Sequence, residues 1–178
     1  MNLLEAKNLY KSFGNINAVS DISISLNVGE VIGFLGPNGA GKSTTMKMLT
    51  GFLEADSGSI EIKKIDLSKD PINAKSIIGY LPEGAPSYSD MTVKSFLYFV
   101  GKMRGLKDEL LEKRLEIMLK DINLSDVQNQ IIETLSKGYK RRVGIAQALI
   151  HDPDILILDE PTDGLDPVSY THLRAHET

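Results

Sequence analysis

Residues 36–44 read GPNGAGKST, and this short stretch carries the strongest structural signal in the chain. It matches the pattern G-x-x-x-x-G-K-[ST], in which a glycine-rich loop cradles phosphate groups. An apolar run, Val31–Leu35, precedes it. A segment with helical spacing, Lys42–Thr50, follows and ends at Gly51, which suits a helix C-terminus. Strand, loop and helix in this order favour phosphate binding over a glycine-rich turn that merely links the two elements.

Each part of the loop has a physical task in holding phosphate. Gly36, Gly39 and Gly41 allow backbone conformations in which successive N–H groups point at phosphate oxygens. The positive end of the helix dipole adds to this attraction. Lys42 would reach the β- and γ-phosphates, and the Ser43 hydroxyl would bind Mg²⁺. We therefore predict an ATP and Mg²⁺ site here. The predicted binding residues of the loop are Gly36, Pro37, Asn38, Gly39, Ala40, Gly41, Lys42, Ser43 and Thr44.

A second apolar segment ends in two carboxylates. The sequence ILILDE covers residues 155–160, and its continuous apolar run predicts a central strand. Asp159 stands at the carboxyl end of that strand, where such sheets bind ligands, and would hold Mg²⁺ through water. Glu160 follows and could polarise an attacking water as a general base. Two surface carboxylates are the alternative, and the phosphate loop makes it the weaker one.

The composition is that of a soluble globular protein. The chain has 178 residues, of which 42% are hydrophobic and 25% are charged, enough for one domain. The 20 basic and 24 acidic residues give a net charge of −4, which argues against a nucleic-acid partner. No cysteine is present, so thiol chemistry and zinc–thiolate sites are excluded. We expect neither a signal peptide nor a membrane span, so any work at a membrane would need another chain.

Five segments have the hydrophobic pattern of strands. Alternation over Ile22–Val28 predicts a half-buried strand, antiparallel and peripheral. The continuous runs Val31–Leu35 and Ile155–Leu158 instead predict central parallel strands covered on both faces. Two further short strands are predicted at Gly58–Lys63 and Ile77–Leu81.

The middle of the chain is predicted to be helical. Helical spacing marks Thr92–Gly101, Lys107–Asp121 and Ser136–Ile150. These helices lie between segments of one predicted parallel sheet, so residues from about 84 to 143 are expected to form a helical subdomain inserted into an α/β core. One face of the second helix carries Leu111, Leu115, Met118 and Leu119.

The segment LSKGYKRR, residues 135–142, opens the third predicted helix with an unusual charge. Its cations are Lys137, Lys140, Arg141 and Arg142. They crowd the first turns of a helix, where the dipole disfavours positive charge. Such a helix start favours an anion, which the Ser136 hydroxyl and the Gly138 N–H could contact. A solvated basic face is the alternative for Lys137 and Lys140.

A family resemblance rests on four motifs in order: the phosphate loop, LSKGY (135–139), ILILDEP (155–161) and GLDP (164–167). Together they resemble the nucleotide-binding domain of ATP-binding cassette (ABC) transporters, from about Met1 to Pro167. The resemblance is specific because other phosphate-loop proteins lack an LSxG-type signature. It implies an α/β P-loop NTPase over residues 1–168, with a RecA-like parallel sheet core, an antiparallel β subdomain and an inserted helical subdomain, incomplete at the C-terminal side.

The resemblance implies an ATP-binding and ATP-hydrolysing subunit of a transporter. Its partners would be a second nucleotide-binding domain, identical or homologous, and transmembrane permease subunits on separate chains, at the cytoplasmic face of the cell membrane. Phe13 would stack on adenine. Ser136, Lys137 and Gly138 would contact the γ-phosphate held by the other subunit, and residues 163–166 would cross the dimer interface. The helical subdomain would couple dimer closure to the permease.

Three positions depart from the family pattern. Glu83, in IGYLPEG, stands where the family usually has Gln, yet it can accept a hydrogen bond from a metal-bound water. Tyr139 replaces a common Gln, and both variants resemble the ABC-2-type exporter branch. Asp163 replaces a usual Ser. The predicted metal-site residues are Ser43, Glu83 and Asp159. The predicted catalytic residues are Lys42, Glu83 and Glu160.

The last ten residues fit no part of the family pattern. Residues 169–178 read SYTHLRAHET and resemble translated sequencing-adaptor read-through, so we expect a non-native tail on a truncated chain. The family's γ-phosphate-sensing histidine is not His172. Only five residues separate it from Asp166, and a parallel crossover needs about a dozen or more. The shortened chain by itself is expected not to hydrolyse ATP.

Two other functions remain as alternatives. A soluble ABC protein of translation or DNA maintenance usually carries two cassettes, coiled-coil insertions or zinc modules, and this sequence has none of them. A cassette that only binds nucleotide for regulation is disfavoured by Glu160. The sequence names no transported substrate and does not establish the direction of transport, because the membrane chains choose the substrate.

Overall fold

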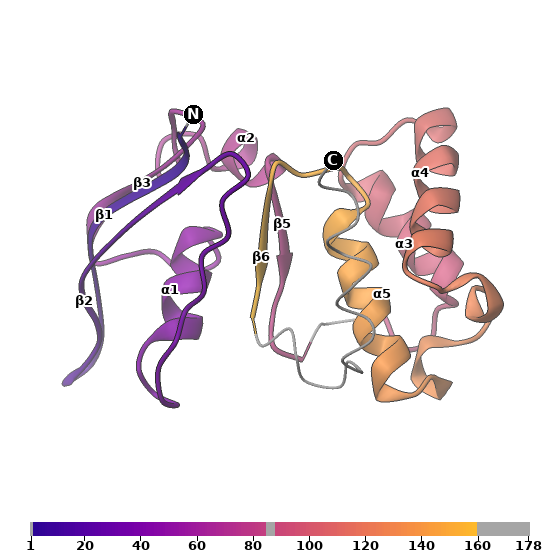
Figure 1. Ribbon diagram of the computed structural model, residues 1–178, viewed down its shortest axis with the longest axis horizontal. Helices are drawn as coiled ribbons and strands as arrows, with labels where there is room; N and C mark the ends of the chain where they lie inside the picture. Colours follow the sequence, from indigo (N-terminus) through magenta and orange to yellow (C-terminus); the bar gives the residue numbers. More distant parts are fainter. Residues whose placement is uncertain (1, 85–87, 160–178) are drawn as a thin grey trace. The chain divides into compact units, whose positions relative to one another are not determined.

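The computed structural model of the protein describes residues 2–84 and 88–159. The chain divides into two compact units (Figure 1). Of the described residues, the first unit comprises those up to Tyr80 together with Pro153–Ile157, and the second comprises those between Leu81 and Asp152 together with Leu158 and Asp159. The helical residues of the second unit are therefore inserted between two parts of the first unit.

The first unit is built on a four-stranded antiparallel sheet in the order β2-β1-β3-β4. The strand predicted at Ile22–Val28 is confirmed as part of β2, which is antiparallel and lies at the sheet edge. The strand predicted at Gly58–Lys63 is confirmed as β3. The elements of this part of the chain are β1 (Asn2–Phe13), β2 (Ile16–Asn27), α1 (Lys42–Leu49), β3 (Ser57–Ile62), β4 (Ile65–Asp66) and α2 (Pro71–Ser76).

Helix α1 packs on one face of this sheet (Figure 1). Met48 and Leu49, in its last turn, are almost completely buried against Leu9 of β1 and Ile62 of β3. The helix ends as predicted, because Gly51 follows it with a φ of +66° and its N–H donates to the Met48 carbonyl. Burial of the last turn therefore fixes the direction in which the first turn points.

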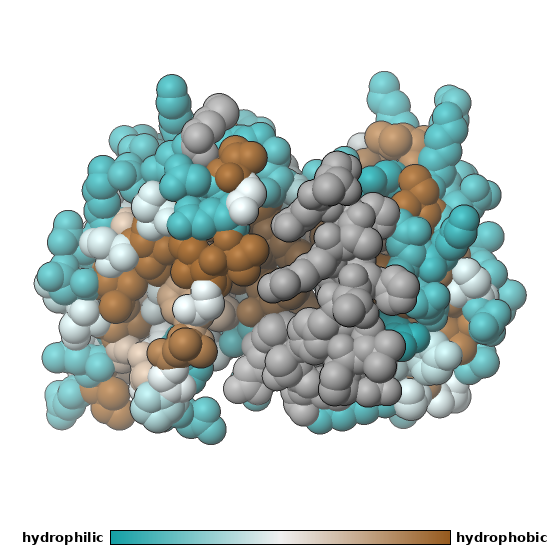
Figure 2. Space-filling view, in the orientation of Figure 1, coloured by the Kyte–Doolittle hydropathy of each residue, from teal (hydrophilic) through white to brown (hydrophobic). Residues whose placement is uncertain are grey.

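The prediction of a strand at Val31–Leu35 is wrong for this structure. The segment has no strand assignment, and Val31 and Leu35 are 87% and 97% exposed. A strand is held by hydrogen bonds to neighbouring strands, and both sheets of the described residues are assembled without this segment. Its apolar side chains add to the apolar surface that Figure 2 shows on the first unit.

Strands β5 (Ile78–Leu81) and β6 (Ile155–Leu158) pair in a two-stranded sheet, which confirms both predicted strands. The Ile155 N–H donates to the Ile77 carbonyl at 3.2 Å, and the Asp159 N–H donates to the Leu81 carbonyl at 2.9 Å. Both partners advance by four residues in the same direction, so the pairing is parallel. The carboxyl ends of the two strands therefore lie side by side.

The second unit is a helical assembly around its own core (Figure 1). The predicted apolar face of the second helix is confirmed, because its four residues (Leu111, Leu115, Met118 and Leu119) are buried. Thr92 and Ser136 cap α3 and α5, each accepting a backbone N–H three residues on. The elements are α3 (Val93–Met103), α4 (Asp108–Asp121), two short 3₁₀ turns (Ser125–Val127 and Ile132–Thr134) and α5 (Lys137–Leu149).

Arg114, on α4, holds the C-terminal end of α5. Its guanidinium donates to the carbonyls of Leu149 at 3.1 Å and Ile150 at 3.3 Å, and it pairs with Asp152 at 2.9 Å. A cation at this end of a helix complements the dipole and satisfies carbonyls that lack partners within the helix. Among the described residues, no helix combines the length and apolar character that crossing a bilayer would require.

Strand β3 approaches the backbone of β1 closely at Gly58, and a substitution there tests this approach. The φ of Gly58 is +101°, and a Cβ there would lie 2.5 Å from the carbonyl oxygens of Lys7 and Asn8. We predict that Gly58→Ala lowers the free energy of unfolding by about 3 kcal/mol or more, since backbone strain and overpacking add. Chemical denaturation followed by circular dichroism measures this change.

Gly14→Ala is the matched control for the Gly58 variant. Gly14 also has a positive φ, +58°, but a Cβ there would meet no atom within 4 Å. The control therefore carries conformational strain without a clash, and about 1 kcal/mol of destabilisation is expected. Equal losses for the two variants would contradict the close approach of β3 to β1.

Candidate functional site

Gly41 forms the turn between the phosphate loop and α1. Its φ is +83°, and a Cβ there would lie 2.2 Å from the Ala18 carbonyl oxygen, so the position accepts only glycine. The Thr45 N–H and hydroxyl both donate to the Gly41 carbonyl, at 2.8 and 2.9 Å, which fixes the start of the helix. The first N–H groups of a helix lack partners within it, so this turn presents donors to an anion.

Lys42 folds back over the loop. Its Nζ donates to the carbonyls of Gly36 at 2.8 Å and Pro37 at 2.9 Å. An ammonium bonded to neutral carbonyls would gain by exchanging them for anionic phosphate oxygens, because charge-assisted hydrogen bonds are stronger. Residues 36–40 are exposed, so a ligand can reach the loop from solvent.

Phe13 ends β1 with half of its surface exposed. The Lys11 ammonium lies 5.7 Å from the centroid of its ring and also pairs with Asp56 at 2.6 Å. One aromatic residue with an accessible face and a nearby cation can stack on a base. The structure thus leaves the ring available for the role expected of it.

Asp159 and Glu83 follow the carboxyl ends of β6 and β5. Asp159 is buried, with 2% exposure, and its N–H bonds to Leu81, whereas Glu83 is exposed two residues beyond Leu81. Two carboxylates therefore extend from the same edge of a parallel pair. Mg²⁺ prefers one or two carboxylates completed by water and phosphate oxygens. Glu83 and Asp159 are ligands of that type; among the described residues, no group of three or more His, Cys, Asp or Glu side chains could hold a metal ion.

The LSKGY segment starts α5. The Ser136 hydroxyl accepts the Tyr139 N–H at 3.4 Å as N-cap, and Lys137 and Gly138 are the first two helical residues. The Arg142 guanidinium lies 5.3 Å from the centroid of the Tyr139 ring, which gives that cation a local contact. The first turn of α5 thus presents backbone donors at its N-terminus, as the anion-binding prediction requires.

Arg141 is placed differently from the expectation of a basic cluster around an anion. It is buried, with 8% exposure, and its guanidinium donates to the carbonyls of Asp159 at 2.8 Å and Pro82 at 3.5 Å. A signal for this was available, since Arg141 shares a helical face with Ile145 and Ala148, at intervals of four and three residues. The charge of the segment alone does not show which of its cations faces inward.

The predicted site residues fall into two groups. Phe13 and residues 36–44 belong to the first unit, whereas Glu83, residues 136–138 and Asp159 belong to the second. Within the second unit, Arg141 of α5 donates to the carbonyls of Pro82, the residue before Glu83, and of Asp159. The catalytic base Glu160, the DGLD segment 163–166 and the expected tail 169–178 lie outside the described residues.

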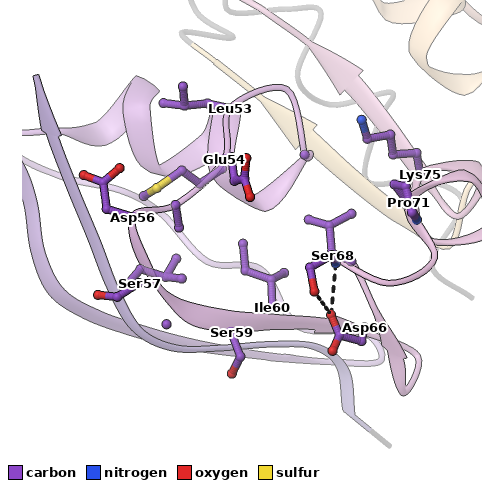
Figure 3. Close-up of a pocket in the computed structure, with 16 residues that line it drawn as sticks. Leu53, Glu54, Asp56, Ser57, Ser59, Ile60, Asp66, Ser68, Pro71 and Lys75 are labelled. Atoms are coloured by element: carbon purple, nitrogen blue, oxygen red, sulfur yellow. Dashed lines mark hydrogen bonds between the residues drawn. The ribbon is translucent and has the colours of Figure 1, made fainter.

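A hollow of about 550 Å³ in the first unit contains none of these residues. It opens between the end of α1, β3 and α2 (Figure 3). Two of its acidic groups are bonded within the unit: Asp56 to Lys11, and Asp66 to the hydroxyl and N–H of Ser68 at 2.7 and 2.9 Å. Hydrogen bonds from Ser68 and Lys69 hold the pKa of Asp66 below its usual range.

Comparisons with known proteins place the chain among ATP-binding cassettes. The family model described as ABC transporter matches residues 19–163. The linearmycin resistance ATP-binding protein LnrL of Bacillus subtilis (strain 168) is 43% identical over 171 residues, which make up 96% of this chain and 55% of LnrL. The chain spans about half the length of such curated relatives.

Solved structures agree in fold. An ATP-binding subunit of an ABC transporter gives a TM-score of 0.88 at 33% identity, covering 96% of this chain and 71% of that one. An ATP-binding cassette of an ABC transporter in its ADP conformation gives 0.78 at 29% identity, covering 97% and 74%. The fold is therefore that of these α/β P-loop ATPase domains, with an antiparallel sheet and a helical part.

Proposed function

The chain belongs to the ABC transporter family, and on that premise we propose that its protein is the ATP-binding and ATP-hydrolysing subunit of a transporter. The observation that carries this proposal is the geometry of the phosphate loop. Gly41 turns the loop into α1, and Lys42 returns its ammonium to the carbonyls of Gly36 and Pro37. ATP would replace those carbonyls with its β- and γ-phosphate oxygens.

The carboxylates supply the chemistry in this proposal. Mg²⁺ would be held by Ser43, Asp159 and, through water, Glu83, and when bound it neutralises charge on the phosphates. Glu160 would take a proton from the attacking water. Support comes from the parallel pairing of β5 and β6, because it puts Glu83 and Asp159 at neighbouring strand ends.

The protein would work as a dimer with membrane chains as partners. Phe13 would stack on the adenine, and residues 136–138 would contact the γ-phosphate held by the second nucleotide-binding domain. The helical subdomain, about 84–143, would pass the closing motion to permease subunits at the cytoplasmic face of the membrane. Export is the direction we propose, supported by the name of LnrL, a resistance protein.

Lys42→Ala tests the phosphate loop in the full-length gene product. We predict loss of ATP hydrolysis and about ten- to hundredfold weaker ATP binding, since charge-assisted hydrogen bonds to phosphate contribute about 1.5–3 kcal/mol. Titration calorimetry with ATP and Mg²⁺ measures the affinity. Lys47→Ala removes a lysine from the same helix, outside the loop, and should leave the affinity unchanged. Unaltered binding by the Lys42 variant would refute the site.

Glu160→Gln tests the proposed general base. The amide keeps the size of the side chain but cannot accept the proton, so hydrolysis should fall about a thousandfold, equivalent to about 4 kcal/mol of barrier. ATP binding should persist, and an ATP-bound dimer should accumulate in size-exclusion chromatography. Glu116→Gln changes an exposed carboxylate of α4 and serves as the control. Hydrolysis at the wild-type rate would show that Glu160 is not the base.

A further inference from the structure

Arg141 is a charged side chain in an apolar setting. It is 8% exposed on the face of α5 that also carries Ile145 and Ala148, which pack with Leu81 of β5. Placing a guanidinium there is unfavourable unless its N–H groups find acceptors. Two of the acceptors that it finds are backbone carbonyls.

The two carbonyls share a position in the fold. The Nη2 of Arg141 donates to Asp159 at 2.8 Å, and Nη1 makes a longer contact of 3.5 Å with Pro82. Each is the first residue after its strand, and the two strands are joined there by the bond from the Asp159 N–H to Leu81. One guanidinium thus spans the carboxyl ends of β5 and β6.

Covalent geometry carries the effect from the carbonyls to the residues that bear carboxylates. A peptide group is planar, so fixing the Pro82 carbonyl also fixes the N and Cα of Glu83, and fixing the Asp159 carbonyl also fixes the Cα of Asp159 itself. We propose that Arg141 is a positioning residue that orients the Glu83 and Asp159 carboxylates for hydrolysis. This rests on the proposed function, in which Glu83 and Asp159 hold Mg²⁺ beside the phosphates.

The choice of arginine is consistent with this role. The planar guanidinium presents donors in a fixed fork and reaches two acceptors at once, which a lysine ammonium does only as a point charge. The adjacent cations of the segment behave differently: Lys140 is exposed, and Arg142 lies over Tyr139. Of these three neighbouring cations, Arg141 is the one that contacts both strand ends.

The test compares Arg141→Met with Lys140→Gln in the full-length gene product. Methionine keeps an unbranched apolar stem and removes every donor, a kind of buried replacement that proteins often tolerate. We expect kcat for ATP hydrolysis to fall at least tenfold with KM within twofold. Hydrogen exchange should quicken in peptides that cover Glu83 and Asp159 while α3 and α4 keep their protection. Lys140→Gln should match the wild type in each measurement.

Three results would overturn the proposal: kcat within twofold of wild type, KM rising in step with the loss of kcat, or faster exchange throughout α3 and α4. The last would mean a general structural role. If the methionine variant fails to fold, Arg141→Lys decides by the same criteria, with a smaller fall in kcat expected because the ammonium keeps a single donor nitrogen in place of the fork. If Glu160→Gln also hydrolyses ATP normally, the proposed function has failed. If Glu160→Gln is inactive but the Arg141 variant hydrolyses ATP at the wild-type rate, the Arg141 proposal alone has failed.

Discussion

The close approach of the Gly41 backbone to the Ala18 carbonyl governs the entry to α1. A side chain at this point would collide with β2, so the loop can turn into the helix only where the residue lacks a Cβ. At the other end of α1, Met48 and Leu49 are locked in the core under the sheet. The direction of the first turn, and with it the position of Lys42, therefore follows from the Gly41–Ala18 approach at one end of α1 and from core packing at the other.

Buried polar side chains in the described residues gather around the same features. They are Thr45, Thr50, Arg141 and Asp159. Both threonines bond carbonyls of α1 itself, and Arg141 bonds the carbonyl of Asp159. The two threonine hydroxyls add to backbone hydrogen bonds that the Gly41 and Lys47 carbonyls already accept. Among the described residues, these buried donors therefore reinforce the two ends of α1 and the carboxyl end of β6.

Local periodicity predicted the elements in which apolar residues recur at regular spacing on one face. The apolar face of α4 and the alternation of β2 follow from repeat spacing alone, and the phosphate loop follows from its motif. Strand β1 escaped notice because bulges break its alternation: Leu3 and Leu4 are both buried, and Asn8 has a φ of +48°. The prediction of a strand at Val31–Leu35 failed for a different reason. The segment has the apolar run of a buried strand, but a strand also needs neighbouring strands to which it can hydrogen-bond.

The pattern of charges predicted the placement of side chains less well than the pattern of apolar residues did. Arg141 was grouped with its neighbours because a sequence shows how many cations a turn carries and not which of them faces inward. Only the tertiary packing of α5 against the strand ends separates this residue from Lys140. The Glu83 and Asp159 positions were predictable, because residues that follow parallel strands meet at one edge of a sheet.

Helix α5 is held at two points along its length. Arg114 of α4 secures its last carbonyls, and its own Arg141 secures it to the carboxyl ends of β5 and β6. Arg141 lies about one and a half helical turns after the Ser136 cap. A displacement of the first turn of α5 would therefore move the Pro82 and Asp159 peptides together, so the two strand ends respond to the helix as one unit.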